Sequence, residues 1–370
     1  MIDAKAAAAA SDDARVVRTL KEGYWDRIEV IERADGSLRV RKSTRADAPQ
    51  GPWGVAALRL EIQYLETLPD GARGAFPALL ARWDDEGFEP PHVGYEAPFY
   101  PDHVDAGQLA RACALTQPQV DEFQDQLADV LFEQVHAPVT SDGPLLSAHV
   151  VSAIEHALKL LEEEPPLERL IRAETIELDG GRRLGTRAAL ARAFCRTETL
   201  RALDATPQVR LHGDFFLENV LFRREASALG PRLLLIDPVS VAGVVQGSPL
   251  FDLVKYESYA TGELFALRRG LVQVSGFEGE EGYRSLVRWD DPELAPFRLR
   301  DWRSRFRSRF DDRYGPADRS AYHLLDGYFG VVMAVNTNGQ QRRARLLGAT
   351  RAFNFAADHN TVGGQVNDGN

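Results

Sequence analysis

Cysteine is scarce in this chain of 370 residues. Cys113 and Cys195 are the only two, and they lie far apart in the sequence. Such a pair excludes the dense disulfide framework of a small secreted domain and the closely spaced cysteines of a zinc site. We therefore expect each to be an ordinary buried thiol rather than half of a disulfide or a metal ligand.

Long apolar runs are also missing, since no stretch approaches the ~18 residues needed to cross a bilayer. The run Ala6–Ala10 is short, has no basic cluster before it and leads into a Ser-Asp-Asp sequence. We expect residues 1–14 to form a flexible leader rather than a secretion signal, and residues 359–370 to form a flexible tail. A cytoplasmic location follows as the expectation.

Positive charge is in deficit, with 44 Lys and Arg against 55 Asp and Glu and a formal net charge of −11. This balance argues against nucleic acid and anionic membranes as partners. It is compatible with attraction of a cationic small molecule, although solubility alone also accounts for an acidic chain. The rest of the composition, 44% hydrophobic and 27% charged, is that of a globular protein.

The chain opens with three strand-like segments, Arg15–Leu20, Arg27–Arg33 and Leu38–Lys42. An Asp-Gly turn signal separates the last two, so an antiparallel meander is expected. The loop Lys21–Asp26 lies where a nucleotide-covering loop would be. It has one glycine and no Gly-x-Gly-x-x-Gly sequence, so it indicates phosphate binding only weakly.

Lysine is rare: five of the 44 basic residues are lysines, and Lys42 lies on the third predicted strand. A compact ammonium group suits phosphate oxygens where a broad guanidinium does not fit. The helix expected at Val55–Leu68 carries Glu61 near its middle, which can pair with Lys42 and aim it at phosphates. Glu66 is the competing partner. The alternatives are an exposed strand lysine and a solvated helix carboxylate.

Two further strands are expected at Pro77–Trp83 and His92–Tyr95, followed by the run Glu96–Pro101. The two prolines of this run suit an extended connector between lobes. Because Pro98 has no N–H, a backbone donor for adenine in this connector must be a neighbouring residue. The candidates for nucleotide contacts here are Glu96, Ala97 and Phe99.

Helical periodicity dominates the remainder of the chain. The sequence predicts an α+β fold, with a small antiparallel-sheet N-lobe at 15–98 and a larger, mainly helical C-lobe at 99–358. The expected helices cover residues 120–135, 146–164, 185–205, 249–256, 320–335 and 341–355, with a small hairpin at 175–184.

The segment 209–239 holds the densest group of candidate catalytic residues. Asp214 and Asn219 precede one short apolar strand, and Asp237 follows the next. A Gly-Pro turn between the strands predicts a hairpin, which would bring three oxygen-bearing side chains to one end. Carboxylate and amide oxygens suit Mg²⁺, and phosphoryl transfer needs a further carboxylate beside the acceptor hydroxyl. The alternative is that these residues only cap turns. The expected strands are Val220–Phe222 and Leu233–Ile236.

These motifs resemble those of the aminoglycoside phosphotransferase family, a group of protein-kinase-like small-molecule kinases. The family signature is a His-Gly-Asp loop with Asn five residues after the Asp, then Ile-Asp after a strand. The later run Gly247-x-Pro249-x-x-Asp252 is most similar to the streptomycin and hydroxyurea kinase branch. The residues that carry the resemblance are His212, Gly213, Asp214, Asn219, Ile236, Asp237 and Pro238.

The resemblance implies a bilobal, protein-kinase-like fold. Asp214 would be the catalytic base, and Asn219 and Asp237 would be the Mg²⁺ ligands. Lys42 would hold the phosphates of ATP or GTP, and Glu61 would anchor Lys42. Gly213 stands where protein kinases carry arginine, and no Ala-Pro-Glu sequence follows Asp237, which argues against a phosphorylation-switched protein kinase.

The expected function is transfer of the γ-phosphate of ATP or GTP to a hydroxyl of a small polar molecule. Acidic loops at 278–281, 290–293 and 311–312 favour a cationic substrate such as an aminoglycoside, amino sugar or aminocyclitol. Antibiotic resistance and biosynthesis are both open as roles. The alternatives are a metabolic or biosynthetic kinase for choline-like, sugar or cyclitol substrates, and a nucleotide-binding pseudokinase.

Overall fold

The computed structural model describes residues 14–23, 26–44, 51–87, 91–139, 145–205, 207–224, 232–239, 243–279 and 282–358. The expected leader lies outside these residues except for its last residue. The whole expected tail lies outside them as well, and so does the Gly-Pro turn of the segment 209–239. The chain forms two compact units. Unit 1 comprises residues 1–115, 122–137 and 210–245, and unit 2 comprises residues 116–121, 138–209 and 246–370.

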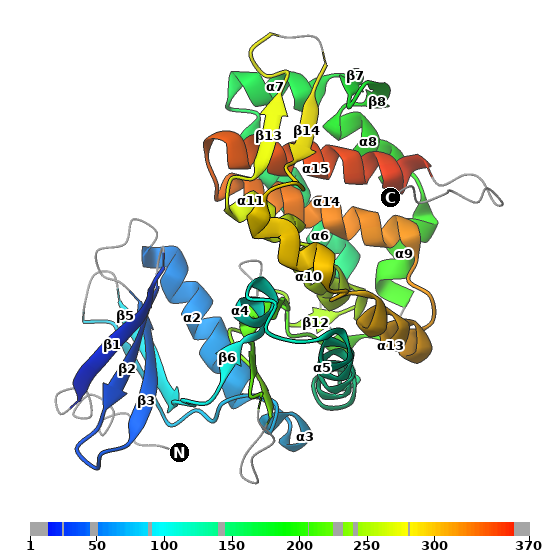
Figure 1. Cartoon of the computed structure of the whole chain (residues 1–370). Helices are drawn as coiled ribbons and strands as arrows, with labels where there is room; N and C mark the ends of the chain where they lie inside the picture. Colours follow the sequence, from blue (N-terminus) through cyan, green and yellow to red (C-terminus); the bar gives the residue numbers. More distant parts are fainter. Residues whose placement is uncertain are drawn as a thin grey trace. The chain divides into compact units, whose positions relative to one another are not determined.

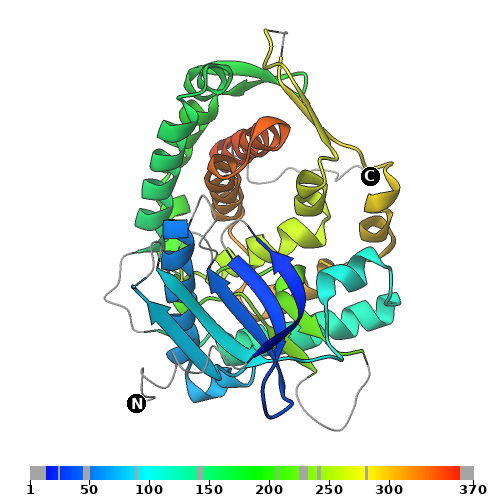
Figure 2. The same ribbon diagram turned by 90° about the vertical axis from the view of Figure 1, so that its left-hand side faces the viewer.

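Unit 1 is built on a five-stranded antiparallel sheet, whose strands lie side by side in Figure 2. Its strands are β1 (Arg15–Glu22), β2 (Asp26–Glu32), β3 (Leu38–Thr44), β4 (Ala81–Asp85) and β5 (His92–Pro98). They lie in the order β1-β2-β3-β5-β4, with every neighbouring pair antiparallel. The predicted meander is therefore present, and β5 is an interior strand between β3 and β4.

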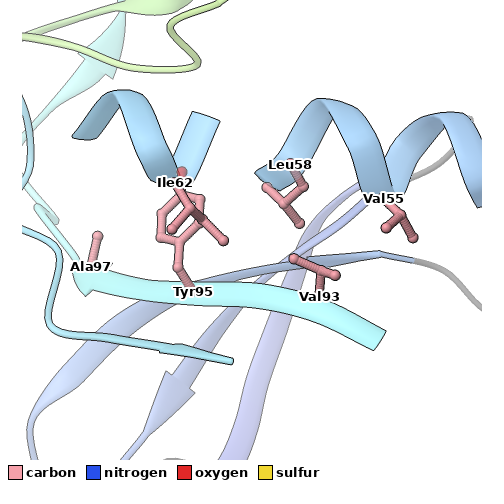
Figure 3. Close-up of a cluster of buried hydrophobic side chains, with 6 residues drawn as sticks. All are labelled: Val55, Leu58, Ile62, Val93, Tyr95 and Ala97. Atoms are coloured by element: carbon pink, nitrogen blue, oxygen red, sulfur yellow. The ribbon is translucent and has the colours of Figure 1, made fainter. Parts of the chain in front are cut away.

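Helix α2 (Gly51–Glu66) packs its apolar side against β5. The helix residues recur every three or four positions and the strand residues every two, so each set points to one side of its element. Burying a large apolar side chain contributes about 1.5–3 kcal/mol, so this contact holds α2 to the sheet. The side chains that meet are Val55, Leu58 and Ile62 from α2 and Val93, Tyr95 and Ala97 from β5 (Figure 3).

Gly94 allows the Trp83 ring and the Lys42 backbone to lie close to β5, on the face of the strand that points away from α2. A Cβ at this position would lie 2.2 Å from the Trp83 ring and 2.7 Å from the carbonyl oxygen of Lys42. Any larger residue would therefore push β4 or β3 away. The sheet needs glycine here to bring the β3 segment that carries Lys42 into register.

Short elements complete unit 1: α3 (Asp70–Arg73), β6 (Val104–Asp105), α4 (Ala106–Arg111), η1 (Val130–Val135), η2 (Leu217–Asn219), β10 (Val220–Phe222) and β11 (Leu233–Leu235). Helix α5 (Gln117–Asp129) begins in unit 2 and continues into unit 1. Strand β10 pairs antiparallel with both β11 and β6. The predicted hairpin of the catalytic segment is thus confirmed.

Unit 2 is mainly helical. Its helices are α6 (Leu146–Leu161), α7 (Pro165–Arg172), α8 (Thr186–Phe194), α9 (Thr197–Ala205), α10 (Leu250–Ala260), α11 (Glu263–Arg268), α12 (Ala295–Leu299), α13 (Ser304–Tyr314), α14 (Arg319–Val335) and α15 (Gly339–Asp358), with the single turn η3 (Pro292–Leu294). Two hairpins join them: β7 (Thr175–Leu178) with β8 (Gly181–Leu184), and β13 (Val272–Ser275) with β14 (Arg284–Val287). The short strands β9 (Val209–Arg210) and β12 (Gln246–Gly247) lie where the chain passes from one unit to the other.

Helices α14 and α15 lie side by side in the middle of unit 2 (Figure 1). Two glycines of α14 make this approach close. A Cβ at Gly327 would lie 2.2 Å from the Phe353 ring, and one at Gly330 would lie 2.9 Å from the Ala349 Cβ. Both helices bury residues on several sides, which is typical of a helix pair at the centre of a core.

The predicted α+β class, with an antiparallel sheet and a larger helical part, is confirmed. Some bounds differ. The fourth strand begins only at Ala81, and β5 continues to Pro98, so half of the predicted connector is strand. Proline is tolerated there because it ends the strand. Burial of both thiols was a wrong prediction, since Cys195 is exposed and Cys113 is half-buried; both are free cysteines.

Within the described part of the chain, every helix is too short or too polar to span a bilayer.

Candidate active site

Lys42 lies at the centre of an ion-pair group in unit 1. Its Nζ donates to Glu61 Oε2 at 2.7 Å and to Asp237 Oδ1 at 2.9 Å. The side chains of Lys42 and Glu61 are each 4% exposed, while that of Asp237 is 25% exposed. The predicted Lys42–Glu61 pair is thus present, and the competing Glu66 pairs with Arg82 instead.

The three charges shift one another's pKa. Burial opposes the ammonium form of Lys42, but the carboxylates of Asp237 and Glu61 outweigh it and raise the pKa of Lys42 well above its usual range. Burial raises the pKa of Glu61 to about 7, although Lys42 pulls it down. Burial would also raise the pKa of Asp237, yet the charge of Lys42 lowers it overall. Asp237 is therefore ionised at neutral pH, and Glu61 is close to its midpoint.

Tyr95 completes this group. Its hydroxyl donates to Glu61 Oε1 at 2.8 Å, so each oxygen of Glu61 has one donor. Tyr95 is 8% exposed and reaches Glu61 from β5, opposite Lys42 in the β3–β5 register. The sequence pattern by itself does not single out this residue. The alternation of β5 could have placed Tyr95 on the face of the sheet that carries Lys42, but only if the register were known.

The loop before β10 joins Asp214 to Asn219. Asn219 Nδ2 donates to the backbone oxygen of Asp214 at 2.8 Å and to Asp214 Oδ2 at 3.3 Å. The backbone oxygen of Asn219 accepts from the N–H of Ile236 at 3.0 Å, which ties the loop to the end of β11. These contacts bring the three predicted residues Asp214, Asn219 and Asp237 into one part of unit 1.

His212 links the two loops that carry these residues. The ring is fully buried and packs on Phe76 and Phe215. Its Nδ1 accepts from the Asp214 N–H at 3.3 Å, so the proton must be on Nε2, which then donates to the Ile236 carbonyl at 3.0 Å. The histidine of the His-Gly-Asp motif therefore acts as a clamp between the Asp214 loop and the residue before Asp237.

The backbone at Asp237 is in an uncommon conformation. Asp237 has φ of 52° and Val239 has φ of 72°, and a positive φ is disfavoured for non-glycine residues, above all for β-branched ones. The Val239 N–H donates to the His212 carbonyl at 2.7 Å, so the clamp also holds this turn. Strain of this kind persists only where the surrounding structure imposes it, and it is concentrated at functional sites.

The oxygens of Asn219 and Asp237 fit a hard divalent cation. Lys42 bonds to Oδ1 of Asp237, and donation from Nδ2 to the Asp214 backbone oxygen orients the amide of Asn219. An ionised carboxylate and an amide oxygen are donors that Mg²⁺ accepts. Among the described residues no group of three or more His, Cys, Asp or Glu side chains could hold a metal. A cation here would therefore rely on few protein ligands, as Mg²⁺ does when it also binds phosphates.

The connector candidates lie at the end of β5 and just after it, and their contact with a nucleotide stays a prediction. The carboxylate of Glu96 is fully buried on the face of the sheet opposite to Lys42, where it accepts from Arg33, Arg39 and Arg41. It therefore cannot reach the group around Lys42, because successive residues of a strand point to opposite faces. The Phe99 N–H donates to the Leu38 carbonyl at 3.3 Å. Ala97 packs its side chain against α2 and opposes Val40 in the sheet.

The sequence matches no protein-family model and no curated protein. In structure the chain is similar to a glucosamine kinase in complex with glucosamine, ADP and inorganic phosphate, at a TM-score of 0.41 and 15% identity over 92% of this chain and 96% of that one. A putative fructosamine-3-kinase from Thermobifida fusca gives 0.47 and 16% over 95% and 97%. Choline kinase from Cryptosporidium parvum gives 0.39 and 12% over 92% and 88%. All three TM-scores are below 0.5 and no identity exceeds 16%, so a function has to be inferred from the residues of unit 1.

Proposed function

We propose that this chain is a Mg²⁺-dependent kinase that transfers the γ-phosphate of ATP or GTP to a hydroxyl of a small polar molecule. The observation that carries the proposal is the group formed by Lys42, Glu61 and Asp237, with Asp214 and Asn219 tied to it through His212. A buried lysine aimed by a carboxylate, beside an ionised aspartate, is the arrangement that phosphoryl transfer uses.

Each residue has a role that follows from its contacts. Lys42 binds nucleotide phosphate oxygens, and Glu61 with Tyr95 holds its ammonium group in place. Asp214 orients the acceptor hydroxyl and takes its proton as the oxygen attacks. Asn219 and Asp237 hold Mg²⁺, which when bound neutralises charge on the phosphates. His212 keeps the Asp214 loop and the Asp237 turn in register.

A cationic substrate is the finer part of the proposal, and an amino sugar, aminocyclitol or aminoglycoside is the class we favour. In unit 2, burial and the neighbouring carboxylate of Glu263 raise the pKa of Asp326 to about 7. Among described residues no cation lies within ion-pair distance of Asp326 or Glu263. A protonated amine would relieve this repulsion. The acidic loops named from the sequence are less suitable, because Glu278 and Glu293 pair with Arg343 and Arg269.

The test is ADP release coupled to a spectrophotometric readout, with ATP and GTP, over aminoglycosides, amino sugars, cyclitols and choline analogues. We expect turnover with an amino-bearing acceptor, and its loss by about 10²–10⁴-fold in Asp214→Ala while nucleotide affinity is retained. Asp70→Ala, which removes a carboxylate from the exposed helix α3, is the matched control and keeps full activity. Undiminished turnover in Asp214→Ala would contradict the assignment of the base.

A further inference from the structure

Arg345 is a buried arginine that nothing in the described chain neutralises. The residue is 6% exposed and lies in the second turn of α15. Its Nε is completely buried and has no hydrogen-bond acceptor. No described residue forms an ion pair or a hydrogen bond with its guanidinium. The buried carboxylate of Glu257 in unit 2, by contrast, accepts from Arg307 and Tyr322.

A buried charge without a counter-ion is unusual, because removal from water penalises the charged form. The pKa of Arg345 shows this effect. Burial lowers it to about 10, and repulsion by Arg268 contributes further. The guanidinium is still protonated at neutral pH. The protein therefore keeps the buried Arg345 within electrostatic reach of Arg268, which is an exposed residue of unit 2.

The position of Arg345 is fixed by the helices around it. Gln341, one turn earlier on α15, donates to the backbone oxygen of Arg268 at 3.1 Å, so the end of α11 faces this side of α15. On the α14 side, a Cβ at Gly330 would lie 3.1 Å from the Arg345 carbonyl oxygen, so the two backbones are in close contact. The backbone cannot shift to carry the guanidinium into solvent.

We propose that Arg345, with Arg268 beside it, binds a small oxyanion, either a carboxylate or a phosphate group. A planar guanidinium offers several N–H donors in the geometry that carboxylate and phosphate oxygens accept. Because Arg345 is only 6% exposed, a macromolecule cannot cover its guanidinium, and a small anion is the ligand that we propose. The carboxylates of Asp326 and Glu263 do not contribute to the pKa of Arg345, so this site is separate from the one suggested for a cation.

Thermal unfolding of the full chain tests the site. Sodium phosphate, sulfate and acetate are each compared with chloride at equal ionic strength, for the wild type and Arg345→Met. We expect a saturable rise of several degrees in the Tm of the wild type and none in the variant. In chloride the variant should unfold at the same temperature as the wild type or higher, because an uncompensated charge has been removed. Arg343→Met, on the same helix but paired with Glu278, is the control and keeps the wild-type response.

Equal responses of the wild type and Arg345→Met, or no response of the wild type to any of the three anions, would overturn the site. So would a lower Tm of the variant in chloride without an anion effect, since that outcome marks a purely structural arginine. If Arg345→Met does not fold, calorimetry with sulfate on Arg268→Met replaces it. We expect the Kd to rise by about threefold or more there, and an unchanged Kd contradicts the proposal.

The source of the oxyanion is decided by a kinetic experiment, which rests on the proposed function, whereas the binding experiments do not. If the site takes an anionic group of the acceptor molecule, saturating sulfate raises the KM for the acceptor and leaves the KM for ATP unchanged. If the site takes a free anion, both KM values stay the same while sulfate still binds.

Discussion

At the scale of single residues, the site depends on how one carboxylate is held. Glu61 is buried, its pKa is raised to about 7, and its two oxygens are bonded by Lys42 and Tyr95. The hydrogen bond from Tyr95 favours the ionised form of Glu61 and lowers its pKa. In the proposed kinase we therefore expect Tyr95 to be a positioning residue, which acts on the nucleotide through Glu61 and Lys42.

Tyr95→Phe should raise the KM for ATP by about three- to tenfold, because a lost hydrogen bond of about 1 kcal/mol loosens the ion pair. The activity needs ionised Glu61, so kcat/KM for ATP should rise with pH through about 7 in the wild type. In the variant this rise should move to higher pH, since a donor that favours the carboxylate is gone. The measurement is a pH profile of kcat/KM.

Tyr328→Phe is the matched control for this variant. Tyr328 is also fully buried, and its hydroxyl bonds to His149 in unit 2 at 3.2 Å. Its loss should cost similar stability and leave the pH profile unchanged. If both variants give the same profile as the wild type, Tyr95 has only a packing role.

At the scale of elements, one buried histidine connects the loop before β10 to the turn after β11. His212 bonds to both the Asp214 N–H and the Ile236 carbonyl, and its own carbonyl accepts from Val239. The turn contains two non-glycine residues with positive φ. Pairing of β10 with β11 does not by itself require a positive φ at Asp237. We therefore attribute the position of Asp237 to the three hydrogen bonds of His212.

His212→Phe keeps an aromatic ring between Phe76 and Phe215 but removes the bonds from the imidazole to the Asp214 N–H and the Ile236 carbonyl, which are part-buried. We expect a loss of about 2 kcal/mol in the free energy of unfolding, measured with urea. The kcat should also fall by about tenfold or more, because a displaced catalytic group loses its alignment. A destabilised variant with an unchanged kcat would show that the clamp serves folding alone.

At the scale of the whole molecule, the compact units do not follow chain order. Unit 1 collects residues 1–115, 122–137 and 210–245, so the catalytic segment belongs with the sheet that carries Lys42. The sequence-based division at residue 98 remains a prediction about lobes. Unit 2 contains two groups with shifted pKa outside the group around Lys42: the pKa of the half-buried Asp326 is raised and that of the buried Arg345 is lowered.

Asp326 should make the stability of the protein pH-dependent. Its pKa in the folded state is about 7, against about 3.9 in an unfolded chain, so the folded state holds the proton more tightly. The contribution is fully present below pH 4 and is lost as the pH rises through 7. Asp326→Asn should therefore be more stable than the wild type at pH 8, by about 1–2 kcal/mol because the group is partly exposed to solvent. Urea unfolding at pH 4 and pH 8 measures this difference, and an equal difference at both values would contradict it.

Much of the fold and the core of the site were predictable from local patterns. The meander, the helix with Glu61 and the β10–β11 hairpin follow from periodicity and turn residues, which depend on neighbours in the chain. The rarity of lysine singled out Lys42, and the spacing of Asp214, Asn219 and Asp237 predicted a catalytic segment, whose role stays a prediction. These signals depend on residue type and spacing along the chain, so they can be recognised in the sequence alone.

Only the tertiary structure decided which side chains meet across long stretches of chain. Lys42 and Asp237 are 195 positions apart, and Tyr95 and Glu61 are 34 apart, so their contacts depend on sheet register and helix packing. One residue of register separates Tyr95, which faces Glu61, from Glu96, which lies fully buried on the opposite face. From the sequence we named Glu96 and missed Tyr95, because period-two alternation says that neighbours diverge but not which one faces the site.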